Sequence, residues 1–557
     1  MPDLGVALSA HSAGRLDEAE GIYRALIEQN RRDSDAIHLL GVIHAQRGDF
    51  QTAVELIRRA LTIKRTPDYC ANLGNALRDL GRFDEAVTAY RAALGLNPRD
   101  ANTQNNFGVA LKRMGRPEEA LAAYRAALDL NPRFSMAHSN LGNALQDLGR
   151  HEEAVAAYRA ALDANPAYAE GYGNLGNALK ALRRYDEALA AYCAAVEINP
   201  RYAAAYSNMG STLHELGRLE EAEAALRMAL DVDPAYGDAH FNLSLVLLQT
   251  GRLAEGWSGY DWRLEKDRHR PSPRRVIERP LWNGTAPPSG KLLVWNEQGV
   301  GDEVMFAGLI PDVQRTGVPC VLECAPRLVP LFARSFPGVE VVARRADGQV
   351  ADRLPEVAAQ IPSGSLPRLF RPTLESFAAT RSPYLTADPA RRDALRARYA
   401  DGRRLVGLTW STCNRENGWM RTLDPAALAP LLETPGVRWV CLQYGDPDAM
   451  AREMAPVAPG LLIDREIDQL ADLDAFAAQV AAMDLVVTID NSTAHFAGAL
   501  GVPTWVLLPH VADWRWLLER EDSPWYPTLR LLRQDRPGDW NGVVRRAVRD
   551  LAAWSNG

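Results

Sequence analysis

Residues 72–98 read NLGNALRDLGRFDEAVTAYRAALGLNP, and this stretch returns with small changes every 34 positions, first at Asn106. The start of the repeat lies at Asn72, Asn106, Asn140, Asn174, Asn208 and Asn242. A Gly-Arg pair follows at Gly81, Gly115, Gly149, Gly217 and Gly251, and an Asn-Pro or Asp-Pro pair closes units at Pro98, Pro132, Pro166, Pro200 and Pro234. Similarity at a fixed period of this length predicts a solenoid of helix pairs.

The second half of each unit has the pattern of an amphipathic helix. Between Phe83 and Leu94, apolar residues recur at spacings of three and four among strong helix formers. An alanine at one phase, where two helices pack closely, recurs at Ala86, Ala120, Ala154, Ala188 and Ala222. The closing prolines end each second helix because proline lacks an N–H and clashes with the preceding turn.

These residues closely resemble the tetratricopeptide-repeat (TPR) family over residues 1–268. With weaker units at Gly14 and Gly48, we count about eight repeats, the first truncated. The recurring asparagines share one phase of the first helix, so stacking is expected to align them along the inner groove. A carboxamide offers donors and an acceptor, and the row (Asn72, Asn106, Asn140, Asn174, Asn208, Asn242) is therefore a candidate site for an extended peptide of an acceptor protein. The alternative is that asparagine is simply common at this position of the repeat.

Length, net charge and cysteine content limit the classes of protein that this chain can belong to. Its 557 residues exceed a single core, and a formal charge of -7 offers no basic surface for nucleic acid. Six scattered cysteines without a CxxC pair favour a reducing, cytoplasmic location, and neither an export signal nor a membrane-spanning apolar run is present. We expect no metal and no cofactor.

Beyond the repeats the composition changes. Residues 269–290 are rich in charge and proline and predict a linker, but Trp257, Trp262 and Trp282 around it indicate packing against a neighbouring domain. Apolar strands are then expected at residues 292–295, 319–324, 405–410, 438–443, 485–489 and 503–508, alternating with helices. That order predicts two doubly wound parallel sheets, in lobes 291–385 and 386–557. Ligands of such folds bind beyond the carboxyl ends of the strands.

Three loops follow expected strands. The first contains Gly299, Gly301 and Asp302, whose open amides suit an anion, although Asp302 could also be a helix N-cap. The second contains Ser411, Asn414 and Arg421, which could hold a diphosphate or simply be solvated. The third contains Asp490, Asn491, Ser492, Thr493 and His495. In it Ser492 or Thr493 is expected to cap a helix that faces a phosphate, and His495 is more commonly a packed helix residue than a catalyst.

The motifs QGVGDE (298–303), DNSTAHFAGALG (490–501) and DWRWLLEREDSPWYP (513–527) resemble the two-lobed GT-B glycosyltransferases related to heptosyltransferases and to TPR-linked O-linked N-acetylglucosamine transferases. Some relatives modify flagellin. The resemblance implies a nucleotide-sugar donor bound by the second lobe, an acceptor on the first, Asp302 as base, and Arg421 near the diphosphate. It also matches Asp490 and His495 to a family element in which Asn491 replaces the usual threonine.

Three functions are consistent with these features. The first is transfer of a sugar from a nucleotide sugar to Ser or Thr of a protein that the repeats recruit. The second is a heptosyltransferase-like reaction on a lipid or surface polysaccharide. The third is a TPR scaffold with an inactive transferase domain.

Overall fold

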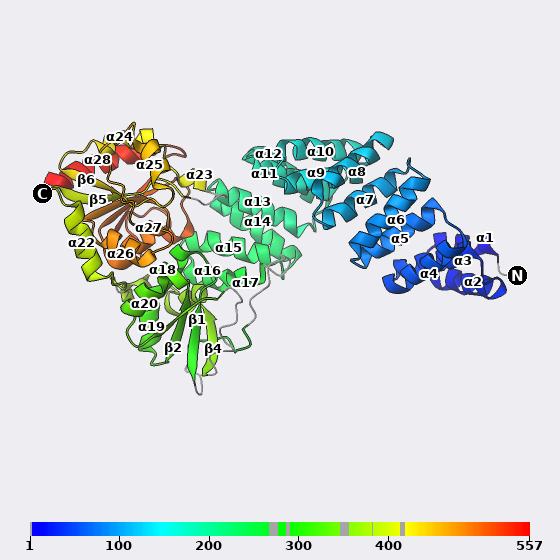
Figure 1. Ribbon diagram of the computed structural model, residues 1–557, viewed down its shortest axis with the longest axis horizontal. Coiled ribbons are helices and arrows are strands. Elements are labelled where there is room, and N and C mark those ends of the chain that lie inside the picture. Colours follow the sequence, from blue (N-terminus) through cyan, green and yellow to red (C-terminus); the bar gives the residue numbers. More distant parts are fainter. Residues whose placement is uncertain are drawn as a thin grey trace. The chain divides into compact units, whose positions relative to one another are not determined.

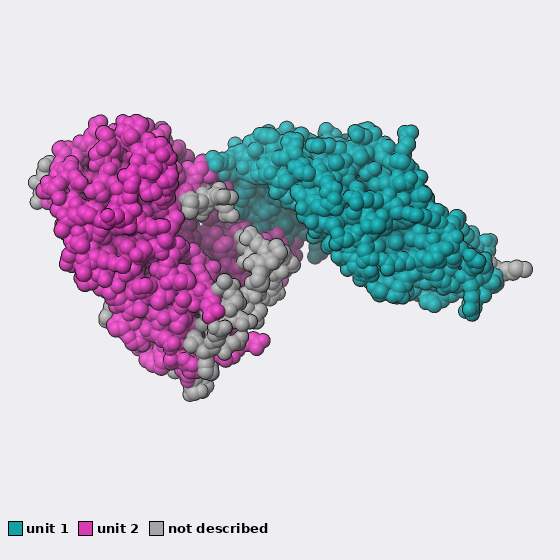
Figure 2. All heavy atoms as spheres, in the orientation of Figure 1, with its two compact units in different colours: residues 1–212 teal, residues 213–557 magenta. Residues whose placement is uncertain are grey.

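The computed structural model describes residues 3–266, 277–285, 290–345, 356–380, 382–412 and 418–556. The chain forms two compact units, residues 1–212 and 213–557, which Figure 2 colours separately. Helices fill the first unit, and the second combines the last repeat helices with two parallel sheets (Figure 1). Among the described residues, no helix has both the length and the apolar character needed to cross a bilayer.

Helices α1 to α16 make eight consecutive pairs and confirm the TPR solenoid. The first helix is short, with nine residues. The pairs are α1 (Leu4–Ser12) with α2 (Leu16–Gln29), α3 (Ser34–Gln46) with α4 (Phe50–Ile63), α5 (Pro67–Asp79) with α6 (Phe83–Leu96), α7 (Ala101–Arg113) with α8 (Pro117–Leu130), α9 (Ser135–Asp147) with α10 (His151–Ala164), α11 (Ala169–Ala181) with α12 (Tyr185–Ile198), α13 (Ala203–Glu215) with α14 (Leu219–Val232), and α15 (Gly237–Gln249) with α16 (Leu253–Tyr260).

The repeated small residues lie where two helices meet. The recurring alanines, such as Ala86 and Ala120, are fully buried. At Gly74 an added Cβ would lie 2.6 Å from the ring of Tyr90, and the same contact recurs in three later repeats. Gly81 has a φ of 80°, which explains glycine in the turn between the paired helices. The second helices end just before each proline, as predicted.

The segment after the repeats packs on the first sheet where it is described. Trp282 is buried, and its indole N–H donates to the Thr285 carbonyl at 2.6 Å. Its backbone N–H donates to the Gln360 carbonyl of strand β4, and the Gln360 N–H donates to the Pro280 carbonyl. Trp257 is buried as well, and Trp262 stacks on His240. Trp282 on the first sheet and Trp257 against Trp514 thus pack as expected, whereas Trp262 stacks within the last repeat. Residues 269–276 and 286–289 of the predicted linker lie outside the described residues.

The first sheet has the order β3-β2-β1-β4 and is parallel throughout. Its strands are β1 (Lys291–Trp295), β2 (Cys320–Cys324), β3 (Glu340–Ala343) and β4 (Val357–Pro362). Its helices are α18 (Val300–Ala307), α19 (Ile310–Arg315), α20 (Val329–Ser335) and α21 (Leu366–Phe370), and the four-residue α17 (Arg263–Lys266) precedes it in the chain.

The second sheet has the order β6-β5-β7-β8-β9 and is also parallel. Its strands are β5 (Arg404–Leu408), β6 (Val437–Cys441), β7 (Leu485–Ile489), β8 (Thr504–Leu508) and β9 (Leu529–Arg533). The accompanying helices are α22 (Pro389–Tyr399), α23 (Gly418–Arg421), α24 (Pro425–Leu432), α25 (Pro447–Met454), α26 (Leu473–Ala481), α27 (Ser492–Leu500) and α28 (Trp540–Asn556). All six expected strands are present, and β3, β4 and β9 are additional.

Strand order marks where ligands bind. The chain crosses over on opposite sides of β1 and of β5, so the switch points lie between β1 and β4 and between β5 and β7. In open parallel sheets the ligand crevice forms at the carboxyl ends beside such points. The three loops singled out in the sequence follow β1, β5 and β7 and therefore lie at these positions.

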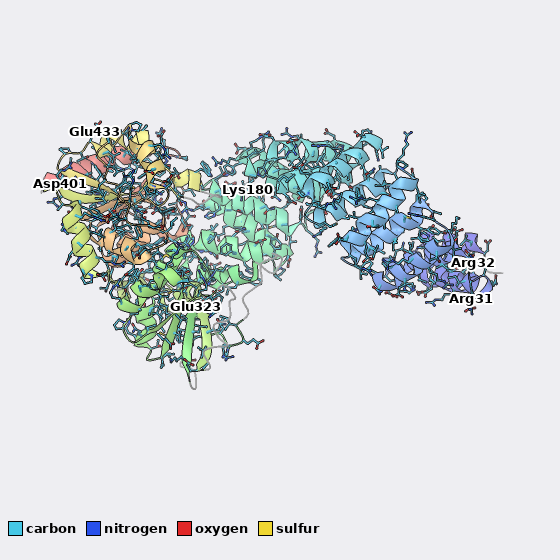
Figure 3. All side chains as sticks on the ribbon, in the orientation of Figure 1. Arg31, Arg32, Lys180, Glu323, Asp401 and Glu433 are labelled. Carbon is cyan, nitrogen blue, oxygen red and sulfur yellow. The ribbon has the colours of Figure 1, made fainter. Side chains whose placement is uncertain are left out.

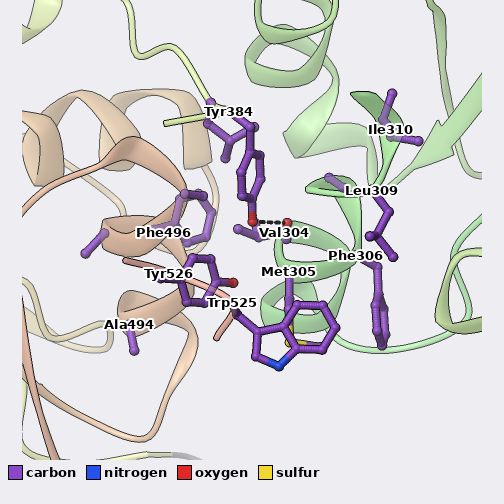
Figure 4. Close-up of a cluster of buried hydrophobic side chains, with 14 of the residues drawn as sticks. Val304, Met305, Phe306, Leu309, Ile310, Tyr384, Ala494, Phe496, Trp525 and Tyr526 are labelled. Atoms are coloured by element: carbon purple, nitrogen blue, oxygen red, sulfur yellow. Dashed lines mark hydrogen bonds between the residues drawn. The ribbon is translucent and has the colours of Figure 1, made fainter. Parts of the chain in front are cut away.

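The two sheets share a core. Helices α18 and α27 pack together, and Figure 4 shows Tyr384 reaching the α18 backbone, where its hydroxyl donates to the Val304 carbonyl at 2.9 Å. The backbone N–H groups of Tyr384 and Leu385 bind the Ala499 carbonyl at the end of α27. The helices that follow the first and third loops are thus fixed against each other.

Candidate functional site

The glycine-rich loop after β1 presents Asp302 from a helix. Helix α18 begins at Val300 with Gly299 as N-cap, so Asp302 is the third helical residue and the alternative of an Asp302 N-cap is wrong. A carboxylate in the first turn interacts favourably with the helix dipole. The Asp302 side chain is 22% exposed and forms an ion pair with Arg515.

Gly301 brings the first loop against the third. A Cβ at Gly301 would lie 3.1 Å from Cδ2 of His495 and 3.5 Å from Cα of Ser492. At Gly299 the nearest such atom is Asp302 Oδ2, at 3.9 Å. A side chain at position 301 would therefore push on His495, whereas position 299 leaves room for one.

The third loop is held by its own asparagine. Asn491 is the N-cap of α27: its Oδ1 accepts from the Thr493 N–H at 3.0 Å, and its Nδ2 donates to Thr409 Oγ1 at 3.1 Å. The prediction that Ser492 or Thr493 caps α27 is thus wrong. The Asn491 carboxamide, which comes before both residues, already accepts the hydrogen bond from the first turn of the helix. Asn491 and Thr493 are buried, whereas Ser492 is half-buried and keeps a partly accessible hydroxyl at the helix N-terminus.

His495 packs between aromatic rings. Its Nδ1 lies 3.0 Å from the Tyr526 hydroxyl, and its ring stacks on Trp516 with centroids 5.5 Å apart. Burial, helped by the charge of Arg515, lowers the pKa of His495 to about 3. The low pKa keeps the imidazole neutral at physiological pH, and its ring contacts agree with the expected packed helix residue.

Arg421 and Asp490 form the second ion pair of the site. Arg421 Nη1 donates to Asp490 Oδ2 at 3.0 Å and to the Asp490 carbonyl at 3.2 Å. Burial raises the pKa of the Asp490 carboxyl, and the Arg421 charge opposes that rise. The pairing connects the helix after the second loop with the start of the third.

The second loop is described only at its start. The Ser411 N–H donates to Gln443 Oε1 at 3.0 Å, and the Ser411 carbonyl accepts from Asn491 Nδ2 at 3.4 Å. The Tyr444 hydroxyl donates to Thr412 Oγ1 at 3.2 Å. The predicted donor-binding residue Asn414 lies outside the described residues, as do Arg415 and Asn417.

Arg515 links Asp302 to Asp513, and the sequence did not identify it as a site residue. It lies in the short helix η6 (Trp514–Trp516) after β8, and its Nη1 donates to Asp513 Oδ1 at 2.6 Å while Nη2 binds Asp302. Asp513 in turn influences the titration of Asp490. Asp302 is thus paired with Arg515, while Arg421 and Asp490 form a separate pair at the third loop, which lies against the first loop at Gly301. The available signal was the motif DWRW at residues 513–516, which carried a family resemblance but indicated no role for Arg515.

The last repeat supports the same loops. Tyr260 of α16 donates its hydroxyl to Gln298 Oε1 at 3.0 Å, and Arg263 of α17 donates to Glu297 Oε1 at 2.6 Å. Trp257 and Tyr260 pack edge-to-face against Trp514, next to Arg515. The end of the solenoid is therefore built into the switch point of the first sheet.

The recurring asparagines bind the preceding repeat. Asn106 Nδ2 donates to Asn75 Oδ1 at 3.1 Å and Asn208 Nδ2 to Asn177 Oδ1 at 2.9 Å. Asn140 Nδ2 donates to Asn105 at 2.9 Å, and Asn72 Nδ2 lies 3.0 Å from His38 Nε2. All six recurring asparagines, including Asn174 and Asn242, are half-buried on the first helix of their pair. Several of their amide donors thus connect repeats, so peptide recognition would depend chiefly on the side-chain oxygens.

Comparisons with known proteins support the repeats most directly. Family models described as tetratricopeptide repeat and TPR repeat match residues 105–169 with 208–256, and residues 74–115 with 177–217. A model described as anaphase-promoting complex, cyclosome, subunit 3 matches residues 12–93. The chain therefore contains tetratricopeptide repeats.

Similar individual proteins cover only parts of the chain. Protein FlbA of Caulobacter vibrioides is 38% identical over 322 residues, which are 54% of this chain and 52% of FlbA. Protein O-mannosyl-transferase TMTC1 of Mus musculus is 34% identical over 98 residues, or 17% of this chain and 10% of that protein. The crystal structure of MamA is 26% identical over 29% of this chain and 95% of MamA, with a TM-score of 0.28. The chain thus spans about half of FlbA and a tenth of TMTC1.

Proposed function

We propose that this chain is a GT-B glycosyltransferase that moves a sugar from a nucleotide sugar to a Ser or Thr hydroxyl of a protein recruited by its repeats. The observation that carries the proposal is the meeting of Asp302, from the first sheet, with Arg515, from the second, beside the pair of Arg421 and Asp490. A carboxylate facing arginines at the carboxyl ends of two parallel sheets suits a reaction that removes one proton and releases one anion.

The donor would bind on the side of the second sheet. A leaving nucleoside diphosphate accumulates negative charge, which arginines and the amides at a helix N-terminus stabilise. Arg421 and the start of α27 at Ser492 supply both kinds of group. Arg421 forms planar, bidentate contacts more readily than lysine would.

The acceptor would approach Asp302. A hydroxyl is a poor nucleophile, so a carboxylate within hydrogen-bond distance takes its proton while the new bond to the sugar carbon forms. The bond between that carbon and the diphosphate oxygen breaks, and its electron pair leaves with the diphosphate. Carboxylates are weak bases in general, so the contribution of Asp302 would come from its orientation by α18.

The repeats support the choice of a protein as acceptor. Stacked TPR helix pairs form extended surfaces suited to binding chains, and the half-buried asparagine oxygens can accept hydrogen bonds from peptide N–H groups. The FlbA likeness extends over more of the chain than the repeat models do. The TMTC1 likeness covers too little of that protein to carry the proposal.

Incubation with candidate nucleotide sugars and cell lysate tests the function. We expect a sugar-sized mass increase on a protein, and labelled glycolipid alone would instead favour the surface-polysaccharide function. Asp302→Ala should abolish transfer without weakening donor binding, because the proton acceptor is lost while the diphosphate contacts remain. The control is Asp401→Ala, before β5 at the opposite end of the second sheet. Unchanged turnover in Asp302→Ala would remove Asp302 as the base.

A further inference from the structure

Arg515 is held between two carboxylates from different parts of the second unit. Nη1 donates to Asp513 Oδ1 at 2.6 Å, and Nη2 binds Asp302 Oδ1. The guanidinium carbon lies 4.3 Å from the centre of the Trp514 ring, which supports it from one side. The Arg515 side chain is only 14% exposed, and its Nε has no hydrogen-bond partner among the described residues.

The network around Arg515 is balanced in charge. Ion pairs join Arg515 to Asp302 and Asp513, and Arg421 to Asp490. Arg533 is a third arginine near them, because its Nη2 donates to the Leu517 carbonyl at 2.9 Å, two residues after Arg515. Nη1 of Arg533 is buried and also lacks a partner within the described part of the chain. The site therefore holds unused N–H donors but little net positive charge.

An incoming diphosphate must alter this balance. It brings at least two negative charges, and it attracts a guanidinium strongly because two parallel N–H groups fit its oxygens. In Arg515 the unpartnered Nε lies next to Nη2, the nitrogen that binds Asp302. A phosphate that binds Nε and Nη2 together would displace the Asp302 carboxylate.

We infer that Arg515 exchanges partners during the reaction: it binds Asp302 in the empty site and passes to the donor's diphosphate when the donor binds. This inference deepens the proposed function and rests on it. Asp513 keeps Nη1 throughout, so the guanidinium turns without leaving its place over Trp514. The exchange frees Asp302 only when a donor is present.

The exchange also specifies where the proton and the electron pair go during transfer. The acceptor oxygen bonds to the sugar carbon, its proton passes to Asp302, and the electron pair of the broken bond stays on the diphosphate oxygen that Arg515 holds. After the diphosphate leaves, Asp302 gives its proton to water and pairs with Arg515 again. Arg515 is thereby a catalytic residue that contacts both the base and the leaving group.

A binding experiment tests the exchange directly. The probe is inorganic pyrophosphate, titrated calorimetrically into the full-length protein. Asp302→Asn removes the competing charge and should tighten binding at least about threefold, the effect of one modest ion pair. Arg515→Gln should weaken binding by about tenfold or more, and Arg515→Lys should restore part of it. Asp401→Asn removes the same charge at the opposite end of the second sheet (Asp401 is labelled in Figure 3) and should leave binding unchanged.

A double-mutant cycle separates exchange from simple electrostatics. If Asp302 competes for Arg515, Asp302→Asn should have little effect once Arg515→Gln is present. Equal tightening in both backgrounds, or no tightening in the single variant, would overturn the exchange. If coupling is found but no sugar is transferred to any acceptor, the exchange stands as anion binding and the proposed function fails. If transfer occurs without coupling, only the exchange fails.

Discussion

Gly299 and Gly301 are two residues apart in one loop, yet a methyl group has room only at the first. Gly301→Ala places a Cβ 3.1 Å from His495 and should separate the first and third loops. We expect a large loss of transfer activity with a modest loss of stability, of about 1–3 kcal/mol for an overpacked site. Gly299→Ala is the matched control, because its Cβ meets nothing closer than 3.9 Å. Equal activity in both variants would show that the contact between the loops is dispensable.

His38 is expected to make the stability of the repeats depend on pH. His38 is buried, stacks on Tyr69 and accepts a hydrogen bond from Asn72, and burial lowers its pKa to about 4. The unfolded chain binds a proton near pH 6.5 and the folded one does not, so stability is complete above that pH and falls as the pH drops towards 4. At about 1.4 kcal/mol per pKa unit, the loss by pH 5 is about 2 kcal/mol.

Hydrogen exchange of the full chain can measure this effect in α3 to α5. Protection factors there, corrected for intrinsic rates, should fall between pH 7.5 and pH 5, and His38→Phe should remove the dependence. Protection that rises towards pH 5 would contradict the sign. Because Asn72 is also a candidate peptide contact, acceptor binding at the first repeats should weaken over the same interval.

At the scale of elements, the pair of α15 and α16 belongs to the candidate site as well as to the solenoid. Burial raises the pKa of Tyr260 to about 12, so its hydroxyl remains a donor to Gln298 at any physiological pH. Tyr260→Phe removes this bond at a cost of about 1 kcal/mol. We expect kcat to fall while the helices stay folded, because the loop that carries Asp302 loses a support. Tyr192→Phe is the control: it removes a similar hydrogen bond to Asn177 within the first unit, and it should leave kcat unchanged.

The same elements show what the sequence could predict. The helix pairs follow from signals repeated within each unit, and six strands follow from apolar runs flanked by turns. Strands β3 and β4 were missed because β3 is exposed at a sheet edge, and because buried residues alternate with half-buried Ala358 and Gln360 in β4 instead of forming one apolar run. The pairing of Asp302 with Arg515 joins residues 213 positions apart, and no local pattern encodes it. The N-cap of α27 was misplaced by one residue because Asn, Ser and Thr are all good caps.

At the scale of the whole molecule, we propose that the repeats bind the acceptor protein and that the loops of the two sheets carry out the transfer. Replacing Asn140, Asn174 and Asn208 together with alanine should raise the KM for a protein acceptor while hydrolysis of the donor continues at its normal rate. The physical reason is that each variant side chain loses a carboxamide that could bind the peptide backbone. The measurement is initial rates with varied acceptor, beside release of free sugar without acceptor.

The triple variant needs a control for stability, because Asn140 and Asn208 also bind neighbouring repeats at about 1 kcal/mol per hydrogen bond. Asn131, Asn165 and Asn199 follow the second helices α8, α10 and α12 of the repeats that contain Asn106, Asn140 and Asn174. Their Oδ1 atoms accept from backbone N–H groups two residues on. Changing these three to alanine removes three hydrogen bonds from a different surface, against two for the row of asparagines. If both triple variants raise the acceptor KM equally, the effect is one of stability and the row of asparagines is not the peptide site. If only the first does, recognition of the acceptor is separated from the chemistry at Asp302.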